Sequence, residues 1–319
     1  MTELLRLTRV ERDTSEERRK AKANLAVRVG DVVASRHEGV LGGEVIRLAQ
    51  AMVLCSLPYS PTPETKVTRR ARLGDGTTLS VTFSAGDDGV AMPYGADRKL
   101  LAWIYDRAIR LNSPIIPWTT VNDYRAELGL TTGGSANRQL AAQFKRIAGL
   151  HISIQRQGAG SGDSARRYAV MQDSKLPTSL LPSVQTSLPG LGDRYGMVLS
   201  PGLFQDISRY FVCLPRELWR DIKAPNQVLD IVHWLFYRSH SANSETIIPW
   251  EALREQFDPE QHIWRVKAHA RQAVKLVATI WPKVKLEVVD QGIWVAYTPE
   301  ALLPDDLTKG RQRRLRAAV

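Results

Sequence analysis

The tetrapeptide Ile-Ile-Pro-Trp occurs twice in this chain, at Ile115-Ile116-Pro117-Trp118 and again at Ile247-Ile248-Pro249-Trp250. Upstream of the two copies, Trp103-Ile104-Tyr105-Asp106-Arg107 aligns with Trp234-Leu235-Phe236-Tyr237-Arg238. Both matches occur in the same order and are displaced along the chain by almost the same amount. We therefore infer that one structural unit is used twice.

The first unit, residues 97–171, combines apolar residues at helical spacing with a hairpin pattern near its end. A Gly/Ser-rich segment, residues 158–164, separates the two apolar runs and is typical of a turn. The pattern predicts, in order, a helix over 97–111, a short helix ending at 128, a helix over 134–148, and strands over 150–154 and 166–171.

The second unit, residues 225–297, repeats this order around the second tetrapeptide. It predicts a helix over 225–239, a strand over 246–250, a short helix over 250–257, a long helix over 261–280 and a hairpin over 283–297. Helix, short helix, helix and hairpin form the order of a helix-turn-helix with a β-wing. We therefore predict an α+β fold of two tandem winged-helix domains, in which each tetrapeptide strand pairs with its wing and each Trp is a core residue.

Domain boundaries are predicted from turn signals and from Pro177, Pro182 and Pro189 between the two units. Near the N-terminus, helices are expected over 11–28 and over 44–55. The predicted domains are an N-terminal helical extension (1–75), the first winged helix (76–172), a linker (173–195), the second winged helix (196–300) and a basic C-terminal tail (301–319).

The composition favours a nucleic-acid partner. Lys and Arg number 44 against 33 Asp and Glu, which gives a net charge of +11. An excess of this kind is one footprint of nucleic-acid binding. Cys55 and Cys213 form no disulfide framework or zinc cluster, and no apolar run is long enough to span a membrane, so we expect a cytoplasmic protein.

Enzyme signatures are absent from the sequence. It contains no Gly-x-x-x-x-Gly-Lys-Ser/Thr motif for phosphate binding, and its six histidines form no His-Glu-x-x-His pattern. His233 lies on an apolar helix and is expected to be a core residue. We therefore predict no catalytic residue, no metal site and no cofactor. A primase or a nicking enzyme remains the alternative of a different class.

The long helix of the second unit is the predicted reader of DNA bases. In a helix-turn-helix, the second helix enters the major groove. Glu260 is the only acidic residue between Pro259 and Trp281. The predicted contacts of this helix are Arg265, Lys267, Arg271, Gln272 and Lys275. In the first unit they are Asn137, Arg138, Lys145 and Arg146 on the helix, with Arg166 and Arg167 on the wing as phosphate contacts.

Several short motifs resemble a known family when they are taken in order. They are Leu57-Pro58-Tyr59, Met92-Pro93-Tyr94-Gly95, Leu100-Leu101-Ala102-Trp103, Leu128-Gly129-Leu130, Gly133-Gly134, Leu199 to Phe204, Leu229-Asp230 and Trp234-Leu235. Over about residues 45–298 the chain resembles the RepA-type replication initiators of broad-host-range plasmids. It departs from them at Ser135 to Gln139, where the family has a further Gly and a helix richer in Arg, so no base preference is carried over.

The resemblance implies an initiator that binds repeated origin sites in double-stranded DNA and opens an adjacent AT-rich segment. It also implies recruitment of a host initiator and a replicative helicase, dimers that repress their own gene, and no nuclease or NTPase activity. Two binding alternatives stay open. One is a sequence-specific transcriptional repressor with the same folds, and the other is a partner-binding protein with degenerate winged helices.

Overall fold

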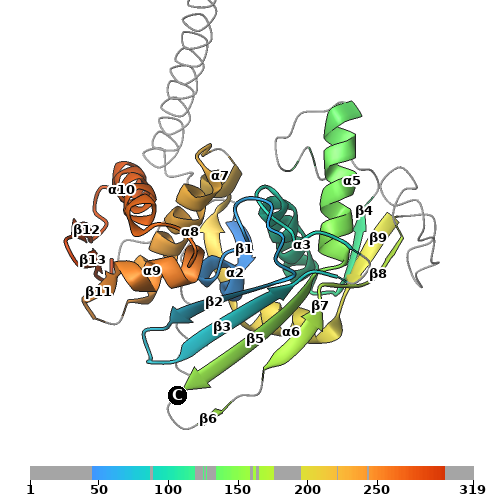
Figure 1. The fold of residues 1–319 in the computed structure, drawn as a ribbon, viewed down its shortest axis with the longest axis horizontal. Coiled ribbons are helices and arrows are strands. Elements are labelled where there is room, and N and C mark those ends of the chain that lie inside the picture. The colour runs from blue at the N-terminus through green and yellow to red at the C-terminus, as the bar shows by residue number, and fades with distance from the viewer. Residues whose placement is uncertain are drawn as a thin grey trace, which may run out of the picture.

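The computed structural model describes residues 45–86, 89–118, 134–158, 161–162, 165–175, 195–220, 222–242 and 244–298, together with Arg125 and Glu127. The predicted helix over 11–28, most of the predicted linker and the basic tail lie outside the described residues, as does most of the short helix ending at 128. The described part is a mixed α/β structure with several small sheets (Figure 1).

The first unit follows the predicted order closely. The apolar stripe gives helix α3 (Asp97–Leu111), the tetrapeptide gives strand β4 (Ile115–Trp118), and helix α5 (Gly134–Ala148) follows. The hairpin consists of β5 (His151–Gly158), the short β6 (Ser161–Gly162) and β7 (Arg166–Ala169). These elements confirm the two longer predicted helices and the hairpin of this unit.

An antiparallel sheet extends the hairpin on its other edge. Strand β2 (Lys66–Arg72) pairs with β3 (Thr78–Ser84), which pairs with β5. Period-two alternation buries Leu79, Val81 and Phe83 on one face. The boundary expected at residue 75 therefore falls inside the β2–β3 hairpin.

The predicted helix over 44–55 is wrong in its first half. Residues Val45–Ala49 form strand β1, and only Gln50–Leu54 form helix α2. Strand β1 pairs with β10 (Phe211–Pro215), a strand from the far side of the sequence, in the register Ile46 to Leu214. The pairing buries Ile46 and Leu48, so long-range packing overrides the local helical pattern.

The predicted pairing of the first tetrapeptide strand with its wing is also wrong. Strand β4 pairs with β9 (Tyr195–Leu199), which also pairs with β8 (Met171–Lys175). The physical reason is that β5 has no edge to offer, because β3 occupies one edge and β6 and β7 occupy the other. The partner strand β9 instead begins at the last residue of the predicted linker and continues into the predicted second domain.

The second unit agrees with the prediction. Helices α6 (Pro201–Arg209) and α7 (Arg216–Arg220) precede α8 (Asn226–Ser241), β11 (Thr246–Pro249), α9 (Trp250–Phe257) and α10 (Ile263–Ile280). The hairpin of β12 (Leu286–Val289) and β13 (Gly292–Val295) follows. Here the tetrapeptide strand β11 does pair with the wing strand β13, as predicted.

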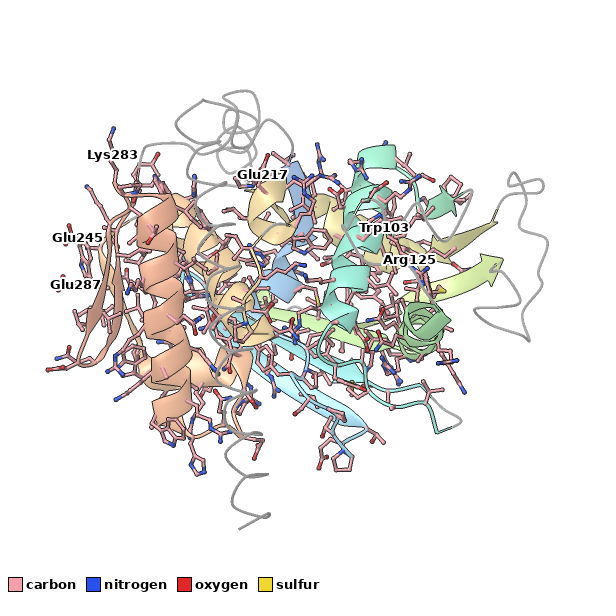
Figure 2. All side chains as sticks on the ribbon, turned by 90° about the horizontal axis from the view of Figure 1, so that it is seen from above. Trp103, Arg125, Glu217, Glu245, Lys283 and Glu287 are labelled. Carbon is pink, nitrogen blue, oxygen red and sulfur yellow. The ribbon has the colours of Figure 1, made fainter. Side chains whose placement is uncertain are left out.

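The internal repeat extends to side-chain contacts. In the first unit, Trp103 donates its indole N–H to Glu127 at 2.7 Å, and the Arg107 guanidinium lies 5.5 Å from the Trp103 ring. Figure 2 shows Trp103 on α3. In the second unit, Trp234 donates to Gln256 at 2.9 Å, and Arg238 lies 5.4 Å from the Trp234 ring. One Trp–Arg pair is thus built twice on equivalent helices.

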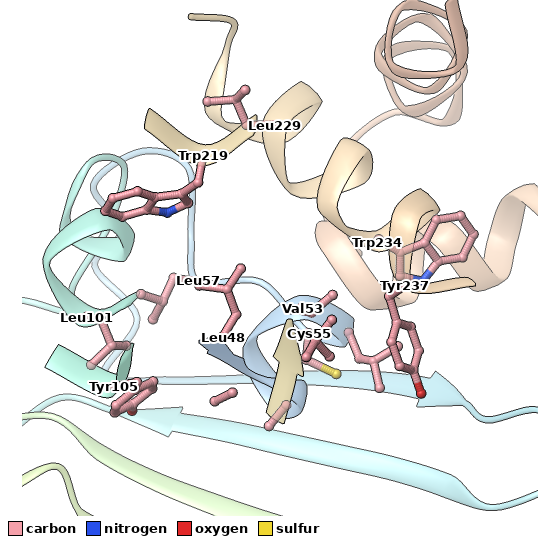
Figure 3. Close-up of a cluster of buried hydrophobic side chains, with 14 of the residues drawn as sticks. Leu48, Val53, Cys55, Leu57, Leu101, Tyr105, Trp219, Leu229, Trp234 and Tyr237 are labelled. Atoms are coloured by element: carbon pink, nitrogen blue, oxygen red, sulfur yellow. The ribbon is translucent and has the colours of Figure 1, made fainter. Parts of the chain in front are cut away.

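One hydrophobic core joins both units. Buried residues from Ile46 to Val295 form a single contact cluster, which includes residues of both units. Figure 3 shows part of it, where Leu48 of β1 and Leu57, which follows α2, face Trp219 and Leu229. No described helix is long and apolar enough to cross a membrane.

We predict that Trp250→Ala lowers the free energy of unfolding by about 3–5 kcal/mol, because it deletes a large buried ring. Trp250 is buried, as predicted, and donates its indole N–H to the Asp290 carbonyl at 2.8 Å. The side chain of its counterpart Trp118 lies outside the described residues. In urea titrations, the exposed Trp264→Ala control should stay within about 0.5 kcal/mol of wild type. A Trp250→Ala variant as stable as wild type would contradict the placement.

His233 is buried in α8, as expected of a core residue, and burial lowers its pKa to about 4, with Lys99 and Arg98 adding to the effect. The ordinary value is 6.5, so the unfolded chain binds more protons between pH 4 and 6.5. This contribution to stability is therefore present above pH 6.5 and is lost as the pH falls. We predict that wild type loses about 2 kcal/mol more than His233→Gln between pH 7 and 5 in urea titrations. Equal losses in the two proteins would refute the assignment.

Candidate nucleic-acid interface

Helix α10 has one buried side and one exposed, cationic side. Val266, Ala270 and Val277 face the core, where the helix packs on α8 and α9. The exposed side carries Ala268 at its centre, with Arg265, Arg271, Gln272 and Lys275 around it. No residue of α10 is acidic. Solvated helix faces ordinarily mix both signs of charge, so this side has the composition of an anion-binding surface.

The first turn of α10 adds a residue that the sequence analysis did not select. Trp264 is 61% exposed, and the Arg265 guanidinium lies 5.2 Å from its ring. A helical projection could have found Trp264, because it falls on the same side as Arg271 and Lys275. Lys267 is half-buried and lies 5.6 Å from the Trp250 ring, so it flanks the cationic side.

Helix α5 of the first unit carries a weaker version of this surface. Arg138 and Lys145 are exposed, whereas the side chain of Asn137 lies outside the described residues. Arg146, the fourth predicted contact of this helix, is half-buried and held in an ion pair. Its guanidinium donates to both carboxylate oxygens of Asp97, at 2.6 and 2.9 Å.

The Arg146–Asp97 pair ties α5 to the start of α3. The Asp97 side chain is only 1% exposed, and its hydrogen bonds hold the pKa of Arg146 above the usual value. Arg146 also lies 4.8 Å from the ring of Tyr94. An Arg that is engaged in this way stabilises the fold and is poorly placed to donate to a phosphate. The hydrophobic spacing of α5 alone could not reveal this ion pair, because Asp97 lies 49 residues earlier in the sequence, on α3.

The two hairpins differ in charge. Arg166 and Arg167 are both exposed on β7, and Arg166 makes a side-chain hydrogen bond with Tyr168. In the second unit, exposed Glu245 and Glu287 lie along the outer side of the sheet with Lys283 nearby (Figure 2). The second hairpin therefore has mixed charge, and the cations of that unit concentrate on α10. Among the described residues, no cluster of His, Cys, Asp and Glu could hold a metal ion.

Similarity to known proteins is limited to solved structures. No protein-family model matches the chain, and no curated protein matches it. A crystal structure of RctB domains 2 and 3 is similar with a TM-score of 0.45 and 10% identity, over 76% of this chain and 94% of that chain. A selenomethionine derivative of the same domains gives a TM-score of 0.45 and 11% identity, over 76% and 89%. A likeness at this level carries no functional conclusion.

We predict that Arg146→Ala lowers the free energy of unfolding by roughly 2–3 kcal/mol, because Asp97 would be left buried without its cation. Breaking a fully buried pair costs about 3–5 kcal/mol, and the smaller value applies here since Arg146 is partly exposed. Lys145→Ala, the neighbouring exposed cation, should cost less than about 0.5 kcal/mol. Thermal and urea unfolding of both variants provides the comparison. Similar stabilities of the two variants would remove the structural role of Arg146.

Proposed function

We propose that the protein binds double-stranded DNA in a sequence-specific manner and that α10 reads the bases. The observation that carries the proposal is the exposed side of α10, which holds Arg265, Arg271, Gln272 and Lys275 without an acidic residue. Arg pairs bidentately with guanine and Gln with adenine, so these residue types suit the edges of the major groove.

The local architecture supports this role. Helix α9 precedes α10 and packs against it, and the β12–β13 hairpin follows with β11 as its third strand. This is the order of a winged helix, in which the second helix of the pair is presented to the major groove. In the first unit, Arg138, Lys145, Arg166 and Arg167 are exposed and serve as contacts to the phosphate backbone.

The biological role that we propose is plasmid replication initiation, because of the ordered motifs that resemble RepA-type initiators. In this role the DNA sites are origin repeats, the free protein forms dimers, and a host initiator and a replicative helicase are the partners. A transcriptional repressor is the second candidate, since binding through α10 serves both roles. A replication assay distinguishes the initiator from the repressor. An initiator gene, together with the DNA sites that its protein binds, should sustain a plasmid that has no other origin, whereas a repressor gene should not.

The test of base reading begins with selection of a binding site from a pool of random duplexes. Arg265→Ala and Arg271→Ala should then weaken binding and also reduce discrimination between the selected and a scrambled duplex, by about 1–3 kcal/mol for each side chain–base pair removed. The matched control, Lys223→Ala, removes an exposed cation that precedes α8 and should leave discrimination unchanged.

Titrations at two salt concentrations complete the measurement, because phosphate contacts make binding salt-dependent. Arg166→Ala and Arg167→Ala should weaken binding to both duplexes by similar factors and reduce the salt slope by about one unit each. Loss of discrimination in these two variants, with discrimination kept in the α10 variants, would reverse the assignment of the reader.

A further inference from the structure

The sheet β2–β3–β5–β7 has an outer face with no acidic residue at its paired positions. The register places Lys66, Arg70 and Arg72 of β2 and Arg167 of β7 on this face. Thr, Ser, Gln, His and Ala occupy its other paired positions. The opposite face is the apolar one that holds Leu79, Val81 and Phe83. In Figure 1 the four strands run side by side in front of α6.

This face is rich in hydrogen-bond donors. Its central residues are short hydroxyl side chains, among them Thr68 and Thr82, whose hydroxyl oxygens lie 2.9 Å apart across the strands. Its paired positions hold no Phe, Tyr or Trp, the residues on which the bases of single strands stack. Guanidinium, ammonium and hydroxyl groups without aromatic rings suit phosphate oxygens better than bases.

A groove continues the face beyond the edge strand β2. It has a volume of about 640 Å³ and lies between the β2–β3 turn and the start of the second unit's sheet. Arg70, Arg72 and Arg238 line it, and Glu255 is the one acidic residue among its described lining residues. Burial lowers the pKa of Arg238, whose guanidinium donates to the Arg72 carbonyl.

Within the described part of the chain, Arg238 has no carboxylate partner of the kind that its counterpart has. In the first unit, the equivalent Arg107 lies 2.7 Å from the Glu127 carboxylate. In the second unit, the side chain that accepts from the equivalent Trp is the amide of Gln256. Among the described residues, no carboxylate lies within ion-pair distance of Arg238. A partly buried cation without a counter-charge is costly unless an anion from outside supplies it.

We propose that the outer face of the β2–β3–β5–β7 sheet and the adjoining Arg70–Arg72–Arg238 groove form a second, sequence-independent binding surface for the phosphate backbone of duplex DNA. This surface is separate from α10, because it lies on the sheet of the first unit. Most of its cations come from strand β2, which holds no predicted site residue. The surface holds the duplex by charge and hydroxyl contacts and contributes no base discrimination.

The sharpest test uses isosteric Gln-to-Glu changes in the full chain. Gln155→Glu adds one negative charge at the centre of the face, opposite Ser80, whereas Gln205→Glu adds the same charge on the exposed side of α6. The probe is a duplex of about 20 base pairs with arbitrary sequence, so no recognition site is needed. Gln155→Glu should weaken binding about tenfold at low salt, and Gln205→Glu should change it less than about twofold.

Removal of the cations gives the second readout. Arg70→Thr/Arg72→Thr replaces both cations by a β-branched residue that favours strands. It should reduce the salt slope by about two units, about 0.9 per phosphate contact. The control, Arg209→Thr/Lys223→Thr, removes two cations elsewhere and should leave the slope unchanged. Arg271→Ala should leave the contribution of the sheet surface to the salt slope intact. A failure of base reading by α10 can therefore be distinguished from a failure of the sheet surface.

Three outcomes would overturn the proposal. The first is an unchanged salt slope in Arg70→Thr/Arg72→Thr, with Gln155→Glu equal to its control. The second is competition by a single strand of equal length at lower concentration than the duplex, which would assign the surface to single strands. The third is equally strong competition by polyglutamate, which would indicate an acidic protein partner.

Discussion

The arrangement of the two units depends on one guanidinium group, that of Arg98 near the start of α3. It donates to the carbonyls of Gly95, Leu57 and Pro58 at 2.7–3.0 Å and to the carboxylate of Asp230 on α8. Burial raises the pKa of Asp230, while Arg98 opposes that shift, and Ser56 and Tyr59 donate to the same oxygen. Without Arg98, the buried Asp230 carboxylate would lose its cation and three carbonyls would lose this donor, at the place where the units meet.

This cluster also explains the motifs that resemble the initiator family. Leu57-Pro58-Tyr59, Gly95 and Asp230 come from three of those motifs, and all of them contact Arg98. Gly95 has a φ of +55° and donates its N–H to the Pro58 carbonyl, a conformation that favours glycine. These three motifs therefore contribute to the junction of the two units, whereas the candidate DNA surface on α10 lies outside all the motifs.

Local patterns predicted most of the elements and part of the site. The stripe of α3, the second unit and the exposed cations of α10 follow from helical spacing within one segment. The predictions that failed depended on distant partners, because β1 pairs with β10 and β4 pairs with β9. The ion pair of Arg146 with Asp97 likewise could not be predicted from spacing within one segment. The outer face of the first sheet, which has no acidic residue at its paired positions, could not be predicted from local spacing. It depends on the register between β3 and β5, which lie far apart in the sequence.

The central claim, that the exposed side of α10 lies against DNA bases, is tested most directly by disulfide cross-linking. Ala268 is exposed at the centre of that side, and Ala268→Cys in a Cys213→Ser background places one accessible thiol there, since Cys55 is buried. The partner is the selected duplex with a thiol tethered to a base in the major groove. We predict efficient cross-linking for Ala268→Cys and background levels for Gln205→Cys on α6. Equal yields at the two positions would contradict the account.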